Sequence, residues 1–180
     1  MALLDTMGLR RVPGTILPMG DGLYVEGMLP SISTHALKAV PDNCYILGHV
    51  PARYSLDGFR VITILRDPRS QLVSYVRHRE REDGIRLSIP QALDDFWGWG
   101  PFVEVYRSFL GWIGRSIVIR YEDMPPAMIG DGSGIYRNHK RDWNTRTGAP
   151  SQWFHVWTAK IDAAWQKHGG PLLLKQAGYT

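Results

Sequence analysis

The sequence has little of several features that mark specialised classes of protein. It contains a single cysteine among 180 residues, which excludes an internal disulfide framework, and no spacing of cysteine and histidine is typical of a zinc site. Apolar runs such as 61–65 and 172–174 are far shorter than the roughly 20 residues that span a bilayer. The first residues, MALLDTMGLRR, lack the basic and apolar regions of a secretory signal. These absences predict a soluble, cytoplasmic protein without a metal site.

The charge of the chain is mildly basic and unevenly distributed. Lys and Arg number 21 against 17 Asp and Glu, which gives a net charge of +4. Basic residues gather in two segments, 66–86 and 137–146, and acids are interspersed in the first. Such segments are either solvated surface or contacts for an anionic partner. The interspersed acids argue against nucleic acid as that partner.

The spacing of apolar residues predicts a single α/β domain over residues 1–180, with a mostly parallel sheet flanked by helices. Short apolar strands alternate with segments that have helical periodicity and start signals. Helices are expected over 2–9, 68–81, 88–96, 102–113 and 151–168, strands over 44–50, 61–65 and 116–120, and loops rich in Pro and Gly over 11–34 and 125–150.

The segment 61–75 carries the clearest chemical signal. A β-branched strand delivers Arg66 to its carboxyl end, and a helix starts at once, with Asp67 as N-cap and Pro68 in the first helical position. Ligands of open α/β sheets bind at this edge, and a helix N-terminus beside a guanidinium suits a phosphate. Ser74, inside the helix, is placed to add a hydroxyl. Two interpretations stay open: Arg66 binds a phosphate, or it pairs with Asp67 or another acid.

Four motifs occur in order along the chain. They are ILGHVPA (46–52), Arg66-Asp-Pro-Arg69 followed by Ser74, IVIRYEDM (117–124), and the basic stretch Arg137-Asn-His-Lys-Arg-Asp-Trp143. Together they resemble the motifs of sulfotransferases that use 3′-phosphoadenosine 5′-phosphosulfate (PAPS) as sulfuryl donor. The resemblance covers about residues 44–170. It implies a fold related to P-loop nucleotide kinases and transfer of a sulfuryl group to a hydroxyl acceptor, either a small molecule or a carbohydrate.

The resemblance also implies roles for individual residues. His49 corresponds to the catalytic base, and Arg66 and Ser74 to the ligands of the 3′-phosphate. Tyr121 corresponds to a tyrosine near the nucleotide. Residues that would close over the 3′-phosphate and adenine follow in one loop: Arg137, Lys140, Arg141 and Trp143. Each has a structural alternative, namely a strand-end histidine, a core tyrosine or tryptophan, or exposed charges.

One departure from the family pattern bears on activity. Sulfotransferases carry a strand and a Lys/Arg-Ser-Gly-Thr-type loop for the 5′-phosphosulfate, and this sequence has no such loop. We therefore expect a chain shortened at its N-terminus relative to the family. The alternative to an active enzyme is a non-catalytic remnant that binds the nucleotide or a protein partner.

The acceptor is less well specified. Segments 11–34 and 77–115 are expected to shape its pocket. Trp97, Trp99 and Phe102 either stack on a sugar or a phenol, or fill the core.

Overall fold

The computed structural model describes residues 8–19, 22–26, 42–124 and 152–180. The chain divides into two compact units, one within Met1–Val61 and Met124–Gly148, the other within Ile62–Asp123 and Ala149–Thr180. Each unit is described by itself below, and the expected single domain over 1–180 stays a prediction. No helix in the described ranges is long and apolar enough to cross a membrane. The expected helix over 2–9 and loop over 125–150 lie almost entirely outside them.

The first unit contains a three-stranded sheet with the order β2-β1-β3. Its strands are β1 (Arg10–Met19), β2 (Gly22–Glu26) and β3 (Cys44–Gly48). β1 pairs antiparallel with β2 and parallel with β3, and Ile16 of β1 and Leu23 of β2 are buried. The strand expected over 44–50 is confirmed, with its end at Gly48.

The loop expected over 11–34 is wrong as far as Glu26, because this part supplies most of β1 and all of β2, and residues 27–34 lie outside the described residues. Pro and Gly normally weaken a strand, since Pro donates no N–H and Gly has no side chain to pack. Here the effect of these residues on strand pairing is confined to one place. The register between β1 and β3 shifts between Arg11 and Thr15, the stretch that contains Pro13 and Gly14. The strand continues on both sides of the shift, which is how a β-bulge accommodates such residues.

The second unit is built on two parallel strands, β4 (Ile62–Leu65) and β5 (Ile117–Arg120). Both were expected from their β-branched residues. The Thr63 and Ser116 hydroxyls lie 2.8 Å apart and join the two strands at their start. Two of the three strand pairs among the described residues are parallel, so the expected mostly parallel α/β class is confirmed.

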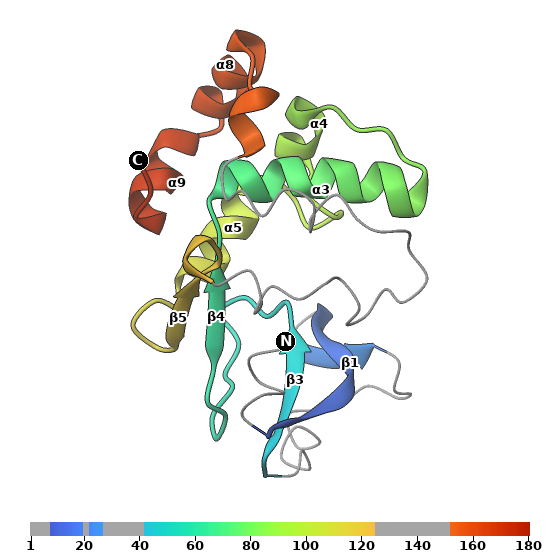
Figure 1. Cartoon of the computed structure of the whole chain (residues 1–180), viewed down its shortest axis with the longest axis vertical. Coiled ribbons are helices and arrows are strands. Elements are labelled where there is room, and N and C mark those ends of the chain that lie inside the picture. Colours follow the sequence, from blue (N-terminus) through green and yellow to red (C-terminus); the bar gives the residue numbers. More distant parts are fainter. Residues whose placement is uncertain (1–7, 20–21, 27–41, 125–151) are drawn as a thin grey trace. The chain divides into compact units, whose positions relative to one another are not determined.

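Helices of the second unit lie between β4 and β5 and after β5, and the first of them continues directly from β4 (Figure 1). They are α3 (Pro68–Asp83), α4 (Ile89–Asp94), α5 (Phe102–Leu110), α8 (Ala159–Lys167) and α9 (Gly170–Ala177), with 3-10 turns η1 (Tyr121–Asp123) and η2 (Gln152–His155). The start signals work as expected: Asp67 caps α3, and Ser88 forms a capping box with Gln91 at α4.

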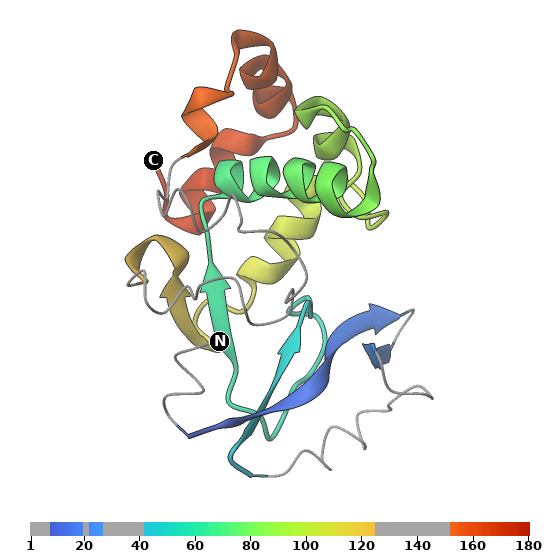
Figure 2. The ribbon, with the colours of Figure 1, turned by 45° about the vertical axis from the view of Figure 1, so that its right-hand side comes forward.

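The core of the second unit forms where these helices pack on one another. α4 contacts α3, α5 and α8, and α9 contacts α5 and α8, as both ribbon views show (Figures 1 and 2). Leu72, Leu93, Phe102 and Leu173 are completely buried there, and Trp165 is nearly so. Phe102 is therefore a core residue rather than part of an acceptor pocket.

The C-terminal helix expected over 151–168 is wrong at its start, whereas its expected end before Gly169 is confirmed, since α8 stops at Lys167 with His168 as its C-cap. A 3-10 turn occupies Gln152–His155, and α8 begins only at Ala159, where the Thr158 hydroxyl accepts the N–H of Ile161. Gly169, expected as a stop, adopts φ 78° and leads straight into α9. The apolar spacing predicted a helix that includes Phe154, but the side chain of Phe154 is exposed and the Thr158 cap sets the start of the helix instead.

Gly170 should be intolerant of any side chain. A Cβ at this position would lie 2.0 Å from the Trp165 ring, which is buried and packed against Trp157. Because that ring has no room to move, Gly170→Ala should lower the free energy of unfolding by about 1–3 kcal/mol in thermal or urea denaturation. Leu172→Ala, at an exposed position of the same helix, is the control and should change stability by about 0.5 kcal/mol or less. Equal stability of the two variants would contradict this packing.

Candidate functional site

The register of β4 and β5 brings Arg66 and Tyr121 together. Leu65 is the register partner of Arg120, so the next residue of each strand leaves the sheet at the same level and edge. The Arg66 guanidinium carbon lies 4.4 Å from the centre of the Tyr121 ring, a cation–π distance. Two of the residues expected to bind nucleotide, from segments 55 positions apart, are therefore in contact.

Arg66 is half-buried and has unused hydrogen-bonding capacity. Its Nε is buried and has no hydrogen-bond partner among the described residues. A buried donor without a partner carries a desolvation cost of about 1–3 kcal/mol. A bound anion that accepts from this group would remove that cost.

Asp67 is not the partner of Arg66. Its carboxylate accepts the backbone N–H of Arg69 at 2.8 Å and also forms a two-pronged ion pair with the Arg69 side chain, at 3.1 and 2.7 Å. Both carboxylate oxygens are thus engaged at the N-terminus of α3. The interpretation of Arg66 as the ion-pair partner of Asp67 is wrong. Because Asp67 itself fills the anion position at the helix end, an external anion must lie beside Arg66 rather than on the helix axis.

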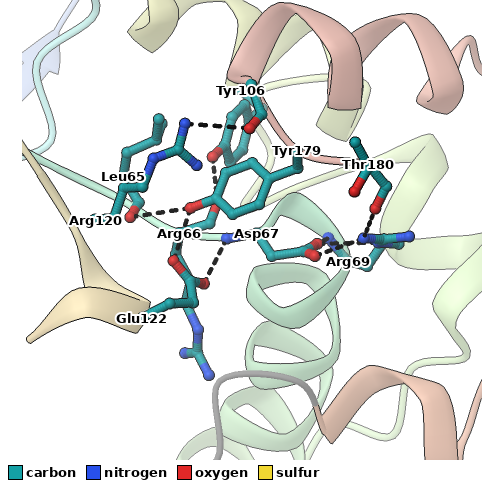
Figure 3. Close-up of polar contacts among 10 residues, drawn as sticks. Leu65, Arg66, Asp67, Arg69, Tyr106, Arg120, Glu122, Tyr179 and Thr180 are labelled. Carbon is teal, nitrogen blue, oxygen red and sulfur yellow. Dashed lines mark hydrogen bonds and ion pairs between the residues drawn. The ribbon is translucent and has the colours of Figure 1, made fainter.

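The peptide group between Arg66 and Asp67 is held at both of its polar atoms (Figure 3). The Tyr106 hydroxyl, from α5, donates to the Arg66 carbonyl oxygen. The Asp67 N–H donates to Oε1 of Glu122, in η1, at 2.8 Å. This double contact sets the direction in which the Arg66 side chain leaves the strand.

Residues from the C-terminal segment support this contact. Oε2 of Glu122 accepts the Tyr179 hydroxyl at 2.7 Å, and the Arg120 guanidinium lies 4.6 Å from the Tyr179 ring (Figure 3). Arg120 also donates to the Gly178 carbonyl at 3.1 Å. Burial raises the pKa of Tyr179 above its usual value, so its hydroxyl stays protonated and remains a donor to Glu122.

Ser74 lies on one face of α3 together with Ser70 and Arg77. Positions i, i+4 and i+7 share a helix face, so these three side chains follow one another along α3 from the Arg66 end. Ser70 is buried, and Ser74 and Arg77 are half-buried. Burial and then the positive charge of Arg66 lower the pKa of Arg77, which means that the two guanidinium groups repel each other. We call Arg66, Ser70, Ser74 and Arg77 the Arg66 face.

His49 belongs to the other unit. It follows β3 directly, its side chain is exposed, and its backbone N–H donates to the Ile16 carbonyl at 2.8 Å. The position at the carboxyl end of a parallel strand is the expected one. Its role as catalytic base stays a prediction.

The remaining expected site residues, Arg137, Lys140, Arg141 and Trp143, lie outside the described residues, and their roles stay predictions. Within the ranges that are described, no group of three His, Cys, Asp or Glu side chains is arranged to hold a metal ion.

Comparison with known proteins gives one structural match. No protein-family model and no curated protein matches the sequence. Among solved structures, the mouse sulfotransferase SULT7A1, crystallised in complex with PAP, has a similar fold, with a TM-score of 0.59 and 14% sequence identity. The match covers 99% of this chain and 84% of that chain. The chain has a sulfotransferase-like fold.

The structure brings two residues expected at the site, Arg66 and Tyr121, into contact and places Ser74 on the Arg66 face, while their binding roles stay predictions. Other residues of this candidate site were not expected from the sequence. Ser70 and Arg77 were detectable, because their spacing of four and three from Ser74 places them on its helix face. Tyr106 and Tyr179 carried no local signal, since their partners are 40 and 57 residues away in sequence.

Tyr106→Phe should separate the hydroxyl contact from the packing of the ring. The change leaves the Arg66 carbonyl without its donor and should lower the free energy of unfolding by about 1–3 kcal/mol at neutral pH. Burial raises the pKa of Tyr106 above its ordinary 10.0, so the wild-type protein should lose stability as pH rises past about 10, where the unfolded chain releases this proton first.

In urea denaturation series at neutral and alkaline pH, Tyr106→Phe should therefore show a shallower alkaline loss than wild type. Tyr54→Phe, which removes a hydroxyl bound to exposed Arg53, is the control. A wild-type alkaline slope in Tyr106→Phe would contradict the buried, protonated donor.

Proposed function

We propose that the protein is a PAPS-dependent sulfotransferase that transfers a sulfuryl group to a hydroxyl acceptor. The observation that carries this proposal is Arg66. Its buried Nε has no hydrogen-bond partner in the part of the chain that the structure describes, and it lies at the carboxyl end of a parallel strand, in a fold similar to that of a sulfotransferase crystallised with PAP. The family motifs at 46–52 and 117–124 support the same assignment.

The Arg66 face fits the 3′-phosphate of the nucleotide. Arg66 supplies a planar fork of donors, Ser74 a hydroxyl, and Arg77 a second cation on the same side of α3. Arg66 and Arg77 repel each other, and a dianionic phosphate between them would attract both. The repulsion between the two cations in the free protein therefore favours binding of an anion. Tyr121 would hold the Arg66 guanidinium from the opposite side through the cation–π contact.

His49 is the proposed general base. An imidazole that is neutral near pH 7 accepts the proton of the acceptor hydroxyl while the new oxygen–sulfur bond forms and the bond from sulfur to the nucleotide's 5′-phosphate oxygen breaks. The bound PAPS supplies the sulfuryl group and leaves as 3′-phosphoadenosine 5′-phosphate (PAP). Arg137, Lys140 and Arg141 are proposed to close over the 3′-phosphate.

Binding without transfer is the second candidate function. The observation that favours it is that the Arg66 face is suited to hold the 3′-phosphate, which anchors the nucleotide but does not react. The two candidates agree on nucleotide binding and differ only in turnover.

PAP should stabilise the protein through Arg66. At a concentration about 100-fold above Kd, a ligand of the native state adds about 2.7 kcal/mol, which raises Tm by roughly 5–10 °C for a chain of this size. Arg66→Ala should abolish the shift measured against the variant's own Tm, and Ser74→Ala should reduce it. Arg86→Ala, which removes an exposed arginine paired with Glu80, is the charge-matched control and should keep the full shift. A full shift in Arg66→Ala would overturn the assignment of the 3′-phosphate site.

Transfer should depend on His49. With PAPS radiolabelled in its sulfuryl group, label should pass to at least one hydroxyl compound in a panel of acceptors. His49→Ala should lower the rate of this transfer by about 10²–10⁴-fold and leave the PAP-induced Tm shift intact. Absence of transfer from a wild-type protein that binds PAP would favour the non-catalytic alternative. Transfer that persists in His49→Ala would remove this residue from the mechanism.

A further inference from the structure

A cavity of about 370 Å³ lies on the side of α3 away from the Arg66 face. Its lining residues come from α3, from α4 and from the loop that follows α4: Tyr75, Arg79, Leu87, Gln91, Asp95, Trp97 and Gly98. At 100° per residue, Tyr75 and Arg79 lie on nearly the opposite side of the helix from Ser70, Ser74 and Arg77. This Trp97 cavity is therefore separate from the proposed nucleotide site.

The backbone at Trp97 is strained. Trp97 has φ 61°, a left-handed conformation that a bulky residue rarely adopts and that costs about 1–3 kcal/mol. It is held there by a hydrogen bond from its N–H to the Tyr75 hydroxyl at 3.0 Å and by the Phe96 N–H, which donates to the Gly100 carbonyl at 2.8 Å. Strain of this kind gathers at ligand-binding loops.

The strained loop presents an aromatic surface to the cavity. The Trp97 ring lies 5.1 Å from that of Tyr75, and the Arg79 guanidinium carbon lies 5.0 Å from the Trp97 ring centre. Trp97 nevertheless remains 38% exposed. A tryptophan that only filled the core would be buried like Trp165, which is 2% exposed.

The polar lining offers donors and acceptors together. Oε1 of Gln91 accepts from the N–H and the hydroxyl of Ser88, which leaves the Gln91 amide N–H groups as donors. One oxygen of Asp95 accepts the Gly100 N–H at 3.3 Å, which leaves the other oxygen as an acceptor. Arg79 adds a cation, itself 3.0 Å from Asp83.

These features select among ligand classes. A free anion would face the Asp95 carboxylate, and a free cation would face Arg79. A phenol carries one hydroxyl and would leave most of the polar groups unpaired, which is costly once water is displaced. A neutral sugar has several hydroxyls that both donate and accept, and an apolar C–H face that packs on an aromatic ring.

We propose that the Trp97 cavity is a binding site for a neutral sugar, stacked on Trp97 and hydrogen-bonded by Arg79, Gln91 and Asp95. This site does not depend on the proposed sulfotransferase function. Because it lies across α3 from the Arg66 face, sugar and nucleotide bind without competing.

Saturation-transfer NMR with cellobiose and N-acetylglucosamine as probes, and 4-nitrophenol as the phenol probe, tests this site on the full chain. At least one sugar should receive saturation, and PAP should not displace it. Trp97→Gly should weaken this binding about tenfold or more, because it removes the stacking ring. Glycine adopts the left-handed backbone at position 97 without strain, so the variant is designed to keep the loop conformation, which circular dichroism checks.

The matched control is Trp99→Ala, which removes an equally exposed tryptophan of the same loop that does not line the cavity and should leave sugar binding unchanged. Should Trp97→Gly fail to fold, Asp95→Asn serves instead. Its remaining oxygen still accepts the Gly100 N–H, but the charge-assisted hydrogen bond from a sugar hydroxyl to the second carboxylate oxygen is lost, so sugar binding should weaken.

No saturation of either sugar, saturation of 4-nitrophenol alone, loss of the sugar signal on adding PAP, or full sugar binding by the folded variant would each overturn the proposal. The PAP-induced Tm shift is read separately, so failure here leaves the nucleotide site untouched.

Discussion

The peptide group between Arg66 and Asp67 is the constraint on which the site depends. Its carbonyl accepts from Tyr106 and its N–H donates to Glu122, so α5 and η1 hold the same few atoms from two directions. The chain must change there from strand to helix, and each of the two groups would otherwise lose a partner. Glu122 is in turn held by Tyr179. A contact formed by three distant segments thus determines where one side chain, Arg66, points.

The same turn separates the ion pair of Asp67 with Arg69 from the two cations Arg66 and Arg77. Asp67 is neutralised by Arg69 on the helix axis, where the carboxylate also interacts favourably with the helix dipole. Arg66 and Arg77 are left on the flank of α3 with a serine-bearing face between them. Had Asp67 paired with Arg66 instead, the positive charge of this flank would be smaller by one. The local ion pair of Asp67 with Arg69 is therefore what leaves Arg66 available.

Sequence reasoning succeeded where local chemistry decides and failed where distant contacts do. β4, α3 and α4 follow from β-branched residues and from the caps Asp67 and Ser88, all within a few positions. β1 was missed because Pro13 and Gly14 weaken the local strand signal, and only pairing with β2 and β3 restores it. At the candidate site, Arg66 and Ser74 were proposed from their family motif, whereas Tyr106 and Tyr179 gave no such signal, because only chain folding brings them to their partners.

α3 connects these observations, because it separates two surfaces with different chemistry. One flank gathers cations and hydroxyls beside the end of β4, and the other packs Tyr75 and Arg79 against the strained loop that carries Trp97. A helix that is anchored at its N-terminal end by the Arg66–Asp67 contact and along its length by fully buried Leu72 cannot rotate to exchange these faces. Strain at Trp97 can persist only against such a rigid support, since a helix free to shift would let the loop relax. A rigid β4–α3 turn thus serves both faces of α3: it fixes the direction of the Arg66 side chain on one face and supports the strained Trp97 backbone on the other.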